Sequence, residues 1–223
     1  MQFTALGDTA VAIEVGEVVT TAVLAKVGAL TLKLRKDPPR GTVEIVPAAT
    51  TVTVFYDPCR ITGFKDFCAE LEIFANKAKL AKVKKPRTII VPVCYGGEFG
   101  PELSVVATQA KLTEKAVVVL HTKPVYTVHA VGFMPGFPYL GGLNPKLHTP
   151  RLDQPRVIVA AGSVGIGGSQ TGIYPFESPG GWNLIGRTPL KLFQAEEVEP
   201  SLFSVGDRVM FKAITMEEFE KWK

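Results

Sequence analysis

Hydrophobic residues follow two different spacings in the first third of the chain. Short alternating apolar runs at 3–6, 10–15, 43–46 and 52–56 predict β-strands, the first two joined by a turn at Gly7-Asp8. Apolar residues at helical spacing predict two amphipathic helices, on the residue sets Val23, Val27, Leu30, Leu34 and Phe64, Phe67, Leu71, Phe74, Ala78. This mixture predicts an α+β N-terminal domain in which two helices cross an antiparallel sheet.

The pattern changes after the basic stretch at 82–86, which we interpret as a linker. A strand at 88–94 and helices at 102–110 and 114–121 come first, the second helix opened by a Thr113 cap. Short apolar runs at 125–131, 157–161, 190–193 and 209–213 then predict strands of a barrel or sandwich. The predicted boundaries are therefore 1–84 for the α+β domain and 85–223 for a mainly-β domain.

Composition narrows the class of protein. The chain has 46% hydrophobic residues, 21% charged residues and a formal net charge of +4, as ordinary globular proteins do. Much of the excess positive charge lies between Lys77 and Arg87, which indicates a solvated helix end and linker, or else a surface for an acidic partner. The three cysteines lack disulfide or zinc-site spacing. With neither a signal peptide nor an apolar run of membrane-spanning length in the sequence, we expect a cytoplasmic protein.

Glycine and proline concentrate between His121 and Phe193, in segments such as 132–142, 161–172 and 177–182. Glycine permits backbone conformations that other residues avoid, and proline fixes φ. We therefore expect these segments to form shaped loops that line one pocket on a β framework.

Two familiar catalytic motifs are incomplete in this region. Ser163 follows a predicted strand as in a nucleophile elbow, but Ala161 replaces the first glycine and no helix follows. A phosphate-binding loop is also missing, because no Gly-Lys-Ser/Thr sequence occurs. The chain therefore shows neither a serine nucleophile nor a nucleotide site of its own.

Two titratable residues are candidates for acid–base chemistry. His121 ends a predicted helix, where the negative end of the dipole favours an imidazolium, so its role is either capping or catalysis. Glu177 lies among the glycine-rich segments and either accepts backbone N–H bonds or acts as a catalytic carboxylate. We predict His121 and Glu177 as catalytic residues, and Asp153 is the alternative to Glu177 as a base.

Neutral polar and aromatic residues supply the candidate binding groups. Gln170, Thr171, Tyr174 and Trp182 are typical of a small polar-ligand site or of an interface hot spot. The nearby arginines offer planar forks for a carboxylate. Arg151 and Arg156 have this role in one interpretation, and pair with Asp153 at the surface in the other.

Three motifs place the chain beside a known family. Gly7-Asp8-Thr9-Ala10, the segment 91–103 (VPVCYGGEFGPEL) and the block from Gly132 to Pro189 are similar to the B subunit of 5-oxoprolinase, also called allophanate hydrolase subunit 1, which is a carboxyltransferase-domain protein. The resemblance extends over essentially the whole chain. It departs at His129-Ala130, where relatives usually carry bulky apolar residues.

The resemblance implies a cyclophilin-like β-barrel after the N-terminal domain, with an active site shared with a barrel-fold partner, the C subunit. Together with the A subunit, the complex would hydrolyse 5-oxo-L-proline to L-glutamate and consume ATP. The complex, rather than this chain alone, would bind the ATP. We expect no metal site in this chain. The predicted substrate-binding residues are Phe137, Tyr139, Arg151, Gln170, Thr171, Tyr174 and Trp182. Thr171 is predicted from its place among the polar residues of the glycine-rich segments, and the resemblance implies the others.

Within this scheme His121 would shuttle a proton and Arg151 would hold the substrate carboxylate. Two other functions remain open. A relative inhibits a sporulation histidine kinase, and others are carboxyltransferase halves of a urea carboxylase or allophanate hydrolase-type enzyme, which would need a biotin-carrying partner.

Overall fold

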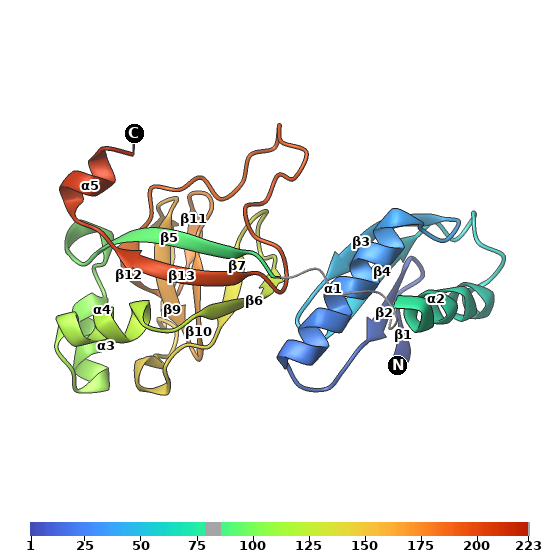
Figure 1. Ribbon diagram of the computed structural model, residues 1–223, viewed down its shortest axis with the longest axis horizontal. Helices are drawn as coiled ribbons and strands as arrows, with labels where there is room; N and C mark the ends of the chain where they lie inside the picture. Colours follow the sequence, from blue (N-terminus) through green and yellow to red (C-terminus); the bar gives the residue numbers. More distant parts are fainter. Residues whose placement is uncertain (79–85, 223) are drawn as a thin grey trace. The chain divides into compact units, whose positions relative to one another are not determined.

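The computed structural model describes residues 1–78 and 86–222, which form two compact units, Met1–Pro86 and Arg87–Lys223 (Figure 1). In the first unit four strands make an antiparallel sheet in the order β1 (Gln2–Leu6), β2 (Ala10–Glu14), β4 (Thr51–Tyr56) and β3 (Thr42–Pro47). Helix α1 (Thr21–Lys36) packs on β3, β4 and α2 (Phe64–Ala78). All the strands and helices predicted before residue 79 are confirmed.

The core of the first unit is formed by the apolar residues that alternate along the strands and recur at helical spacing along the helices. Strand alternation turns Val11 and Ile13 on β2, and Val52 and Val54 on β4, toward the helices, and all four are fully buried. The α1 stripe that includes Leu30 is buried against them. Thr20 caps α1 by accepting a hydrogen bond from the Val23 N–H at 3.1 Å.

The second unit contains a closed barrel of seven strands among the described residues. Their order is β10 (Gln170–Ile173), β7 (Pro138–Gly141), β6 (Tyr126–Val131), β13 (Arg208–Ala213), β5 (Thr88–Tyr95), β12 (Asn183–Arg187) and β9 (Ser163–Gly167), and β9 pairs with β10 to close it. The β13–β5 pair is parallel and the other pairs are antiparallel. A single apolar core fills the barrel and the space under the helices.

Helices and a small ribbon surround this barrel. Helices α3 (Leu103–Ala110) and α4 (Glu114–Thr122) pack together, and α4 begins at the predicted Thr113 cap, whose hydroxyl accepts from the Ala116 N–H at 3.2 Å. Short turns η1 (Gly97–Phe99) and η2 (Pro145–Leu147) lie beside them, and α5 (Met216–Glu220) follows β13. Strands β8 (Arg156–Val159) and β11 (Ser178–Gly180) pair only with each other.

Several predictions for this half were wrong. The run at 190–193 is not a strand, although Leu192 is buried, and the run at 157–161 contributes β8 to the ribbon rather than to the barrel. Conversely, the glycine-rich segments expected to be loops carry β7, β9 and β10. Their glycines hide the usual alternation of apolar and polar residues, so the strand signal was missed.

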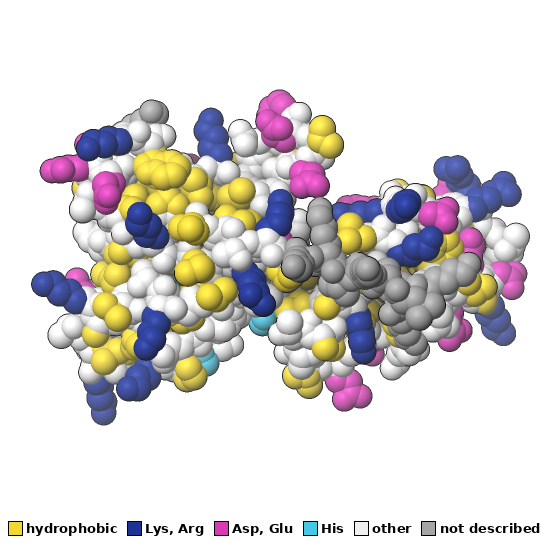
Figure 2. Space-filling view, viewed as in Figure 1, with side chains coloured by type: hydrophobic (Ala, Val, Ile, Leu, Met, Phe, Trp, Pro, Cys, Tyr) yellow, Lys and Arg dark blue, Asp and Glu magenta, His cyan; other side chains and the backbone are white. Residues whose placement is uncertain are grey.

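The predicted linker at 82–86 lies, except for Pro86, outside the described residues, as does most of the basic cluster between 77 and 87. On the barrel-unit face seen in Figure 2, lysine and arginine side chains are dispersed among hydrophobic ones. Among the described residues, no helix has both the length and the apolar character needed to cross a lipid bilayer.

Arg87 fixes the start of β5 to the loop before β13. Its guanidinium donates to both carboxylate oxygens of Asp207, at 2.6 and 3.3 Å, and to the Ser204 hydroxyl at 3.3 Å. Asp207 is 6% exposed and also accepts from the Ser204 N–H at 2.9 Å. The buried carboxylate therefore depends on Arg87 for its counter-charge, and the same pairing raises the pKa of the Arg87 guanidinium.

We expect Arg87→Ala to lower the free energy of unfolding of the barrel unit by about 1–3 kcal/mol, because it leaves a buried carboxylate without its cation. Urea denaturation measures this. Arg208→Ala, which removes an exposed arginine on the neighbouring strand, is the matched control and should change stability by less than about 0.5 kcal/mol. Equal effects of the two substitutions would contradict the role given to Arg87.

Candidate functional site

The predicted site residues divide between the two faces of the β7–β10–β9 sheet. Thr171 lies opposite Leu140, and both point into the barrel core, where each is fully buried. Gly172 lies opposite Tyr139, so the Tyr139 side chain lies on the other, outer face. Gln170 precedes Thr171 and shares this outer face with Gly172.

An aromatic cluster covers the outer face. Phe137 lies at its centre, with ring centroids 4.9 Å from Tyr139, 5.2 Å from Tyr174 and 5.5 Å from Trp182, all edge-to-face. Phe137, Tyr174 and Trp182 are 5% exposed or less, and Val159 and Leu184 complete the cluster. The sequence-predicted binding aromatics therefore converge on one place.

Three glycines, which have no side chain, leave room for these rings. A Cβ on Gly167 would lie 2.6 Å from the Trp182 indole, and one on Gly180 would lie 2.5 Å from the Tyr174 hydroxyl. A Cβ on Gly172 would meet both Phe137 and Trp182 within 3.0 Å. None of these three glycines has a positive φ. They are needed for close approach of aromatic rings to the strands rather than for tight turns.

Gly167→Ala should displace the Trp182 indole and destabilise the unit by about 1–3 kcal/mol, because the added methyl group overpacks the contact. In a Trp222→Phe background the emission of Trp182 should shift to longer wavelength as the ring becomes hydrated. The control is Gly132→Ala, where a Cβ meets nothing within 4 Å. An unshifted spectrum for Gly167→Ala would contradict this account.

One cation lies over the cluster. The Arg151 guanidinium is 5.7 Å from the centroid of the Trp182 ring, and Arg151 is exposed. Burial raises the pKa of both Tyr139 and Tyr174, and the nearby Arg151 charge offsets this only in part. The site therefore combines a fixed positive charge with two neutral phenols on an apolar base.

His121 lies on the inner face instead, at the end of α4, and is fully buried. Its Nε2 is 3.0 Å from the Thr171 hydroxyl, which itself donates to the Gly165 carbonyl at 2.9 Å. Since that hydroxyl has one proton, Nε2–H must donate to Thr171. His121 Nδ1 then accepts from the Tyr95 hydroxyl at 2.8 Å, and both ring nitrogens are satisfied in a neutral imidazole.

The predicted imidazolium at His121 was therefore wrong. Burial lowers the pKa of His121 to about 3, against an ordinary value of 6.5, and this outweighs the helix dipole. Burial likewise raises the pKa of Tyr95 well above 10, so its hydroxyl keeps the proton that it donates. Sequence reasoning missed Tyr95, because no local spacing connects it with His121.

Because the pKa of His121 is lower in the folded state, acid should destabilise the barrel unit. The unfolded chain binds a proton as the pH falls through about 6.5, and the folded chain does not until about pH 3. Stability should thus fall by about 2 kcal/mol from pH 7 to pH 5 on account of this one residue. Urea denaturation at the two pH values, followed by Trp182 fluorescence, measures the loss.

His121→Gln should remove most of this pH dependence, and His148→Gln, at an exposed histidine, should leave it in place. Identical pH dependence in the wild type and His121→Gln would show that His121 is not the group responsible.

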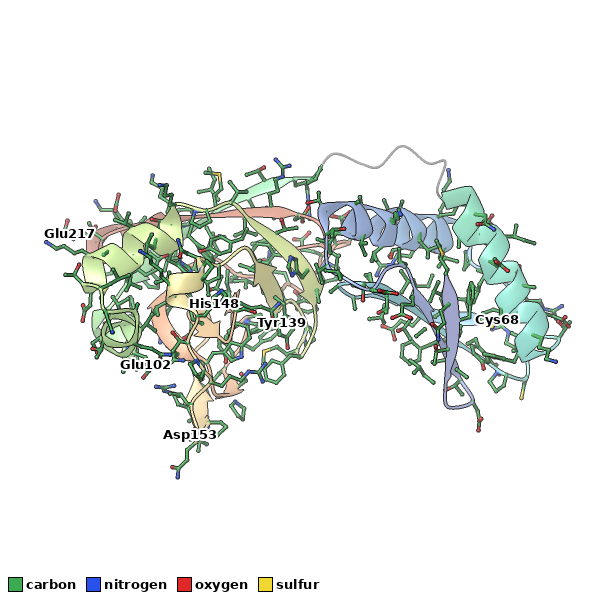
Figure 3. All side chains as sticks on the ribbon, turned by 90° about the horizontal axis from the view of Figure 1, so that it is seen from below. Cys68, Glu102, Tyr139, His148, Asp153 and Glu217 are labelled. Atoms are coloured by element: carbon green, nitrogen blue, oxygen red, sulfur yellow. The ribbon has the colours of Figure 1, made fainter. Side chains whose placement is uncertain are left out.

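Arg156 has a partner that neither interpretation anticipated. Its guanidinium pairs with Glu102 Oε1, while Glu102 Oε2 accepts from the Leu184 N–H at 2.8 Å. Glu102 is 8% exposed. The predicted pairing with Asp153 is wrong, and Asp153 projects from the unit away from Glu102 (Figure 3). The separation of 54 positions between Arg156 and Glu102 explains why sequence spacing gave no sign of the pair.

The remaining candidates lie at the surface. Glu177 is exposed, and within the described part of the chain its carboxylate makes no hydrogen bond or ion pair, so it does not accept the backbone N–H bonds considered above. Gln170 is half-buried. Ser163 is 1% exposed at the start of β9. Residues 1–78 and 86–222 contain no group of histidine, cysteine and carboxylate side chains suited to a metal ion.

Comparison with known proteins gives the class to which this fold and site belong. Residues 1–203 match the family described as carboxyltransferase domain, subdomain C and D. The chain is 40% identical to the 5-oxoprolinase B subunit of Bacillus subtilis, covering 100% of this chain and 96% of that protein. It is 48% identical to the 5-oxoprolinase B subunit of Haemophilus influenzae, covering 76% of this chain and 78% of that protein. The chain therefore belongs to the 5-oxoprolinase B-subunit family of carboxyltransferase-domain proteins.

Solved structures agree with the fold. A conserved uncharacterized protein of Pyrococcus horikoshii is 40% identical, with 98% of this chain and 100% of that one covered and a TM-score of 0.59. TTHA0988 is 36% identical with a TM-score of 0.79, and the match covers 92% of this chain but 40% of that longer chain. The Kluyveromyces lactis urea carboxylase, 20% identical with a TM-score of 0.75, shares the fold.

Proposed function

We propose that this chain is the B subunit of an ATP-dependent 5-oxoprolinase, which hydrolyses 5-oxo-L-proline to L-glutamate together with the A and C subunits. The assignment to 5-oxoprolinase is supported by relatives that are named as B subunits of this enzyme. The same names support the existence of partners, and the identity of these partners as the A and C subunits belongs to the proposal. The proposal also includes three further points. The two units fold separately, the barrel is cyclophilin-like, and the protein is cytoplasmic.

The observation that carries the proposal is the Arg151 guanidinium 5.7 Å above the Trp182 ring, beside Tyr139. The substrate is a small flat lactam ring with one carboxylate. The aromatic cluster gives the site an apolar base, the guanidinium suits the carboxylate, and the half-buried Tyr139 phenol can donate to the lactam oxygen. Gln170, on the same outer face, adds an amide that can donate or accept.

The reaction sets what the site must do. Phosphorylation by ATP at the lactam oxygen makes the ring carbon electrophilic, and water then attacks that carbon, the C–N bond breaks and the nitrogen takes a proton. One water is consumed in opening the amide and another in releasing phosphate, which gives glutamate, ADP and phosphate. Donors fixed around the oxygen stabilise the charge that develops there. Within this scheme the chain binds and orients substrate, and ATP is handled by the assembled complex.

His121 has a different role in this proposal from the predicted proton shuttle. Its ring is fully buried, and both nitrogens are engaged by Tyr95 and Thr171. We assign it to positioning, since it fixes Thr171 on β10 and thereby the outer face next to it. Glu177 remains the proposed base, because its carboxylate is exposed and makes no hydrogen bond or ion pair with the described residues.

A carboxyltransferase reaction is the second candidate. The family description supports it, as does a putative urea carboxylase of Emericella nidulans that is 29% identical over 57% of this chain and 11% of that protein. A biotin-carrying partner would then be required. Inhibition of a histidine kinase stays a prediction.

Arg151→Ala in the reconstituted three-subunit enzyme should raise KM for 5-oxo-L-proline about 10- to 100-fold, because the substrate carboxylate loses its charged partner. Its selectivity for 5-oxo-L-proline over 2-pyrrolidinone, which lacks the carboxylate, should fall by a similar factor. ATP-dependent glutamate release measures the first, and ring opening of each lactam the second. Lys146→Ala, at an exposed site, is the control.

Unchanged selectivity in Arg151→Ala would contradict the carboxylate assignment. Absence of glutamate release from the wild-type complex, with carboxyl transfer from biotin present, would favour the second candidate.

A further inference from the structure

The short segment 150–152, which carries Arg151 at its centre, runs antiparallel to residues 181–183 at the start of β12. At its C-terminal end the Leu152 N–H donates to the Gly181 carbonyl at 2.7 Å. This bond fixes the backbone on one side of Arg151.

The other side of Arg151 is held by both backbone and side-chain groups. Thr149 and Gly168 exchange two backbone hydrogen bonds, of 2.8 and 3.2 Å. Pro150 has no N–H to donate, and its carbonyl accepts a hydrogen bond from the Asn183 amide nitrogen at 2.8 Å. The Asn183 side chain therefore makes the contact next to Arg151 that a backbone pairing would otherwise supply.

Asn183 connects this surface segment to the wall of the barrel. It is 2% exposed, and its amide nitrogen also donates to the carbonyl of Ile166 on β9 at 3.3 Å. Both partners are carbonyl oxygens, which can only accept, so the amide nitrogen and not the amide oxygen must face them. Pro150 lies at the surface, where water could satisfy its carbonyl. A buried amide is therefore not required there for hydrogen bonding alone.

The place of the Arg151 guanidinium depends on this backbone. Arg151 has a long, exposed side chain that makes no hydrogen bond or ion pair with the described residues. Its contact with the Trp182 ring, at 5.7 Å, is of a kind that is weak at exposed sites. An arginine whose backbone moved would therefore keep little that returns its charge to the same position.

We propose that Asn183 is the positioning residue for Arg151. Its amide fixes the backbone at Pro150, so that the guanidinium stays over the Trp182 ring, where the substrate carboxylate would bind. This inference rests on the proposed function. Because Asn183 is buried, it acts through Arg151 and not on the substrate itself.

The first test is kinetic and uses Asn183→Leu, which keeps the volume of the side chain and removes the donor. In the reconstituted three-subunit enzyme it should raise KM for 5-oxo-L-proline about 3- to 30-fold and change kcat by less than about twofold. Selectivity over 2-pyrrolidinone should fall by the same factor as KM rises. In an Arg151→Ala background the same substitution should cause no further loss of selectivity, because the residue it positions is gone.

Thr188→Val is the matched control. It removes another buried polar group, just after β12, whose hydroxyl accepts from the Leu190 N–H at 3.3 Å and not from the segment 150–152. It should leave the selectivity between the two lactams unchanged. Urea denaturation of both variants shows how much of any effect follows from stability alone.

The second test needs no activity and uses the free chain. Trypsin cleavage after Arg151, mapped by mass spectrometry, should be about fivefold faster in Asn183→Leu than in the wild type, because the backbone is released. Cleavage after Lys191, an exposed residue beyond β12, should change by less than about twofold and reports general unfolding. Asn183→Ser, whose hydroxyl is too short to reach Pro150, is a second variant with the same expected result.

Wild-type cleavage after Arg151 in both Asn183 variants would overturn the proposal. So would equal acceleration after Arg151 and Lys191, which would assign Asn183 to general stability, or a further loss of selectivity in the Arg151→Ala background. Absence of glutamate release from the wild-type complex would instead reject the oxoprolinase function, and cleavage after Arg151 would then decide by itself whether Asn183 positions this residue.

Discussion

The pairing of β9 with β10 closes the barrel, and its register decides which face each candidate residue reaches. Gly172 lies opposite Gly165 and Gln170 opposite Gly167, so four outer-face positions in this pair carry three glycines and one glutamine. Trp182 lies across the space that the glycines leave. Thr171, between two of these positions, points inward to His121. A shift of one residue would exchange the two sets and destroy both.

The inner and outer faces have different physical tasks. Inside, a chain of hydrogen bonds from Tyr95 through His121 and Thr171 to the Gly165 carbonyl satisfies the polar groups that burial has removed from water. Outside, packed aromatic rings support an exposed guanidinium. The buried network is neutral and specifies where β10 lies, and the outer face offers the charge and the apolar surface that a ligand can use.

Exposure next to the aromatic cluster fits a protein that works in a complex. Val157 and Ile158 on the β8–β11 ribbon, and Phe133 beside Phe137, hold apolar side chains in water, and the Phe133 backbone has a strained φ of +69°. Such features are costly in a chain that acts alone, and they become favourable when another polypeptide buries them.

Spacing along the chain was enough to predict the elements of the first unit, because its strands contain no glycine and Gly28 lies off the apolar stripe of α1. The sequence also pointed to the aromatic residues that converge on the outer face. It also carried the motifs by which the family is known. The state of His121 could not be predicted in this way, since its pKa depends on burial in the folded barrel rather than on its place in the helix. The partner of Arg156 and the strands within the glycine-rich segments were likewise decided by contacts distant in sequence. Spacing along a chain reports local periodicity, whereas these properties depend on which residues meet across the barrel.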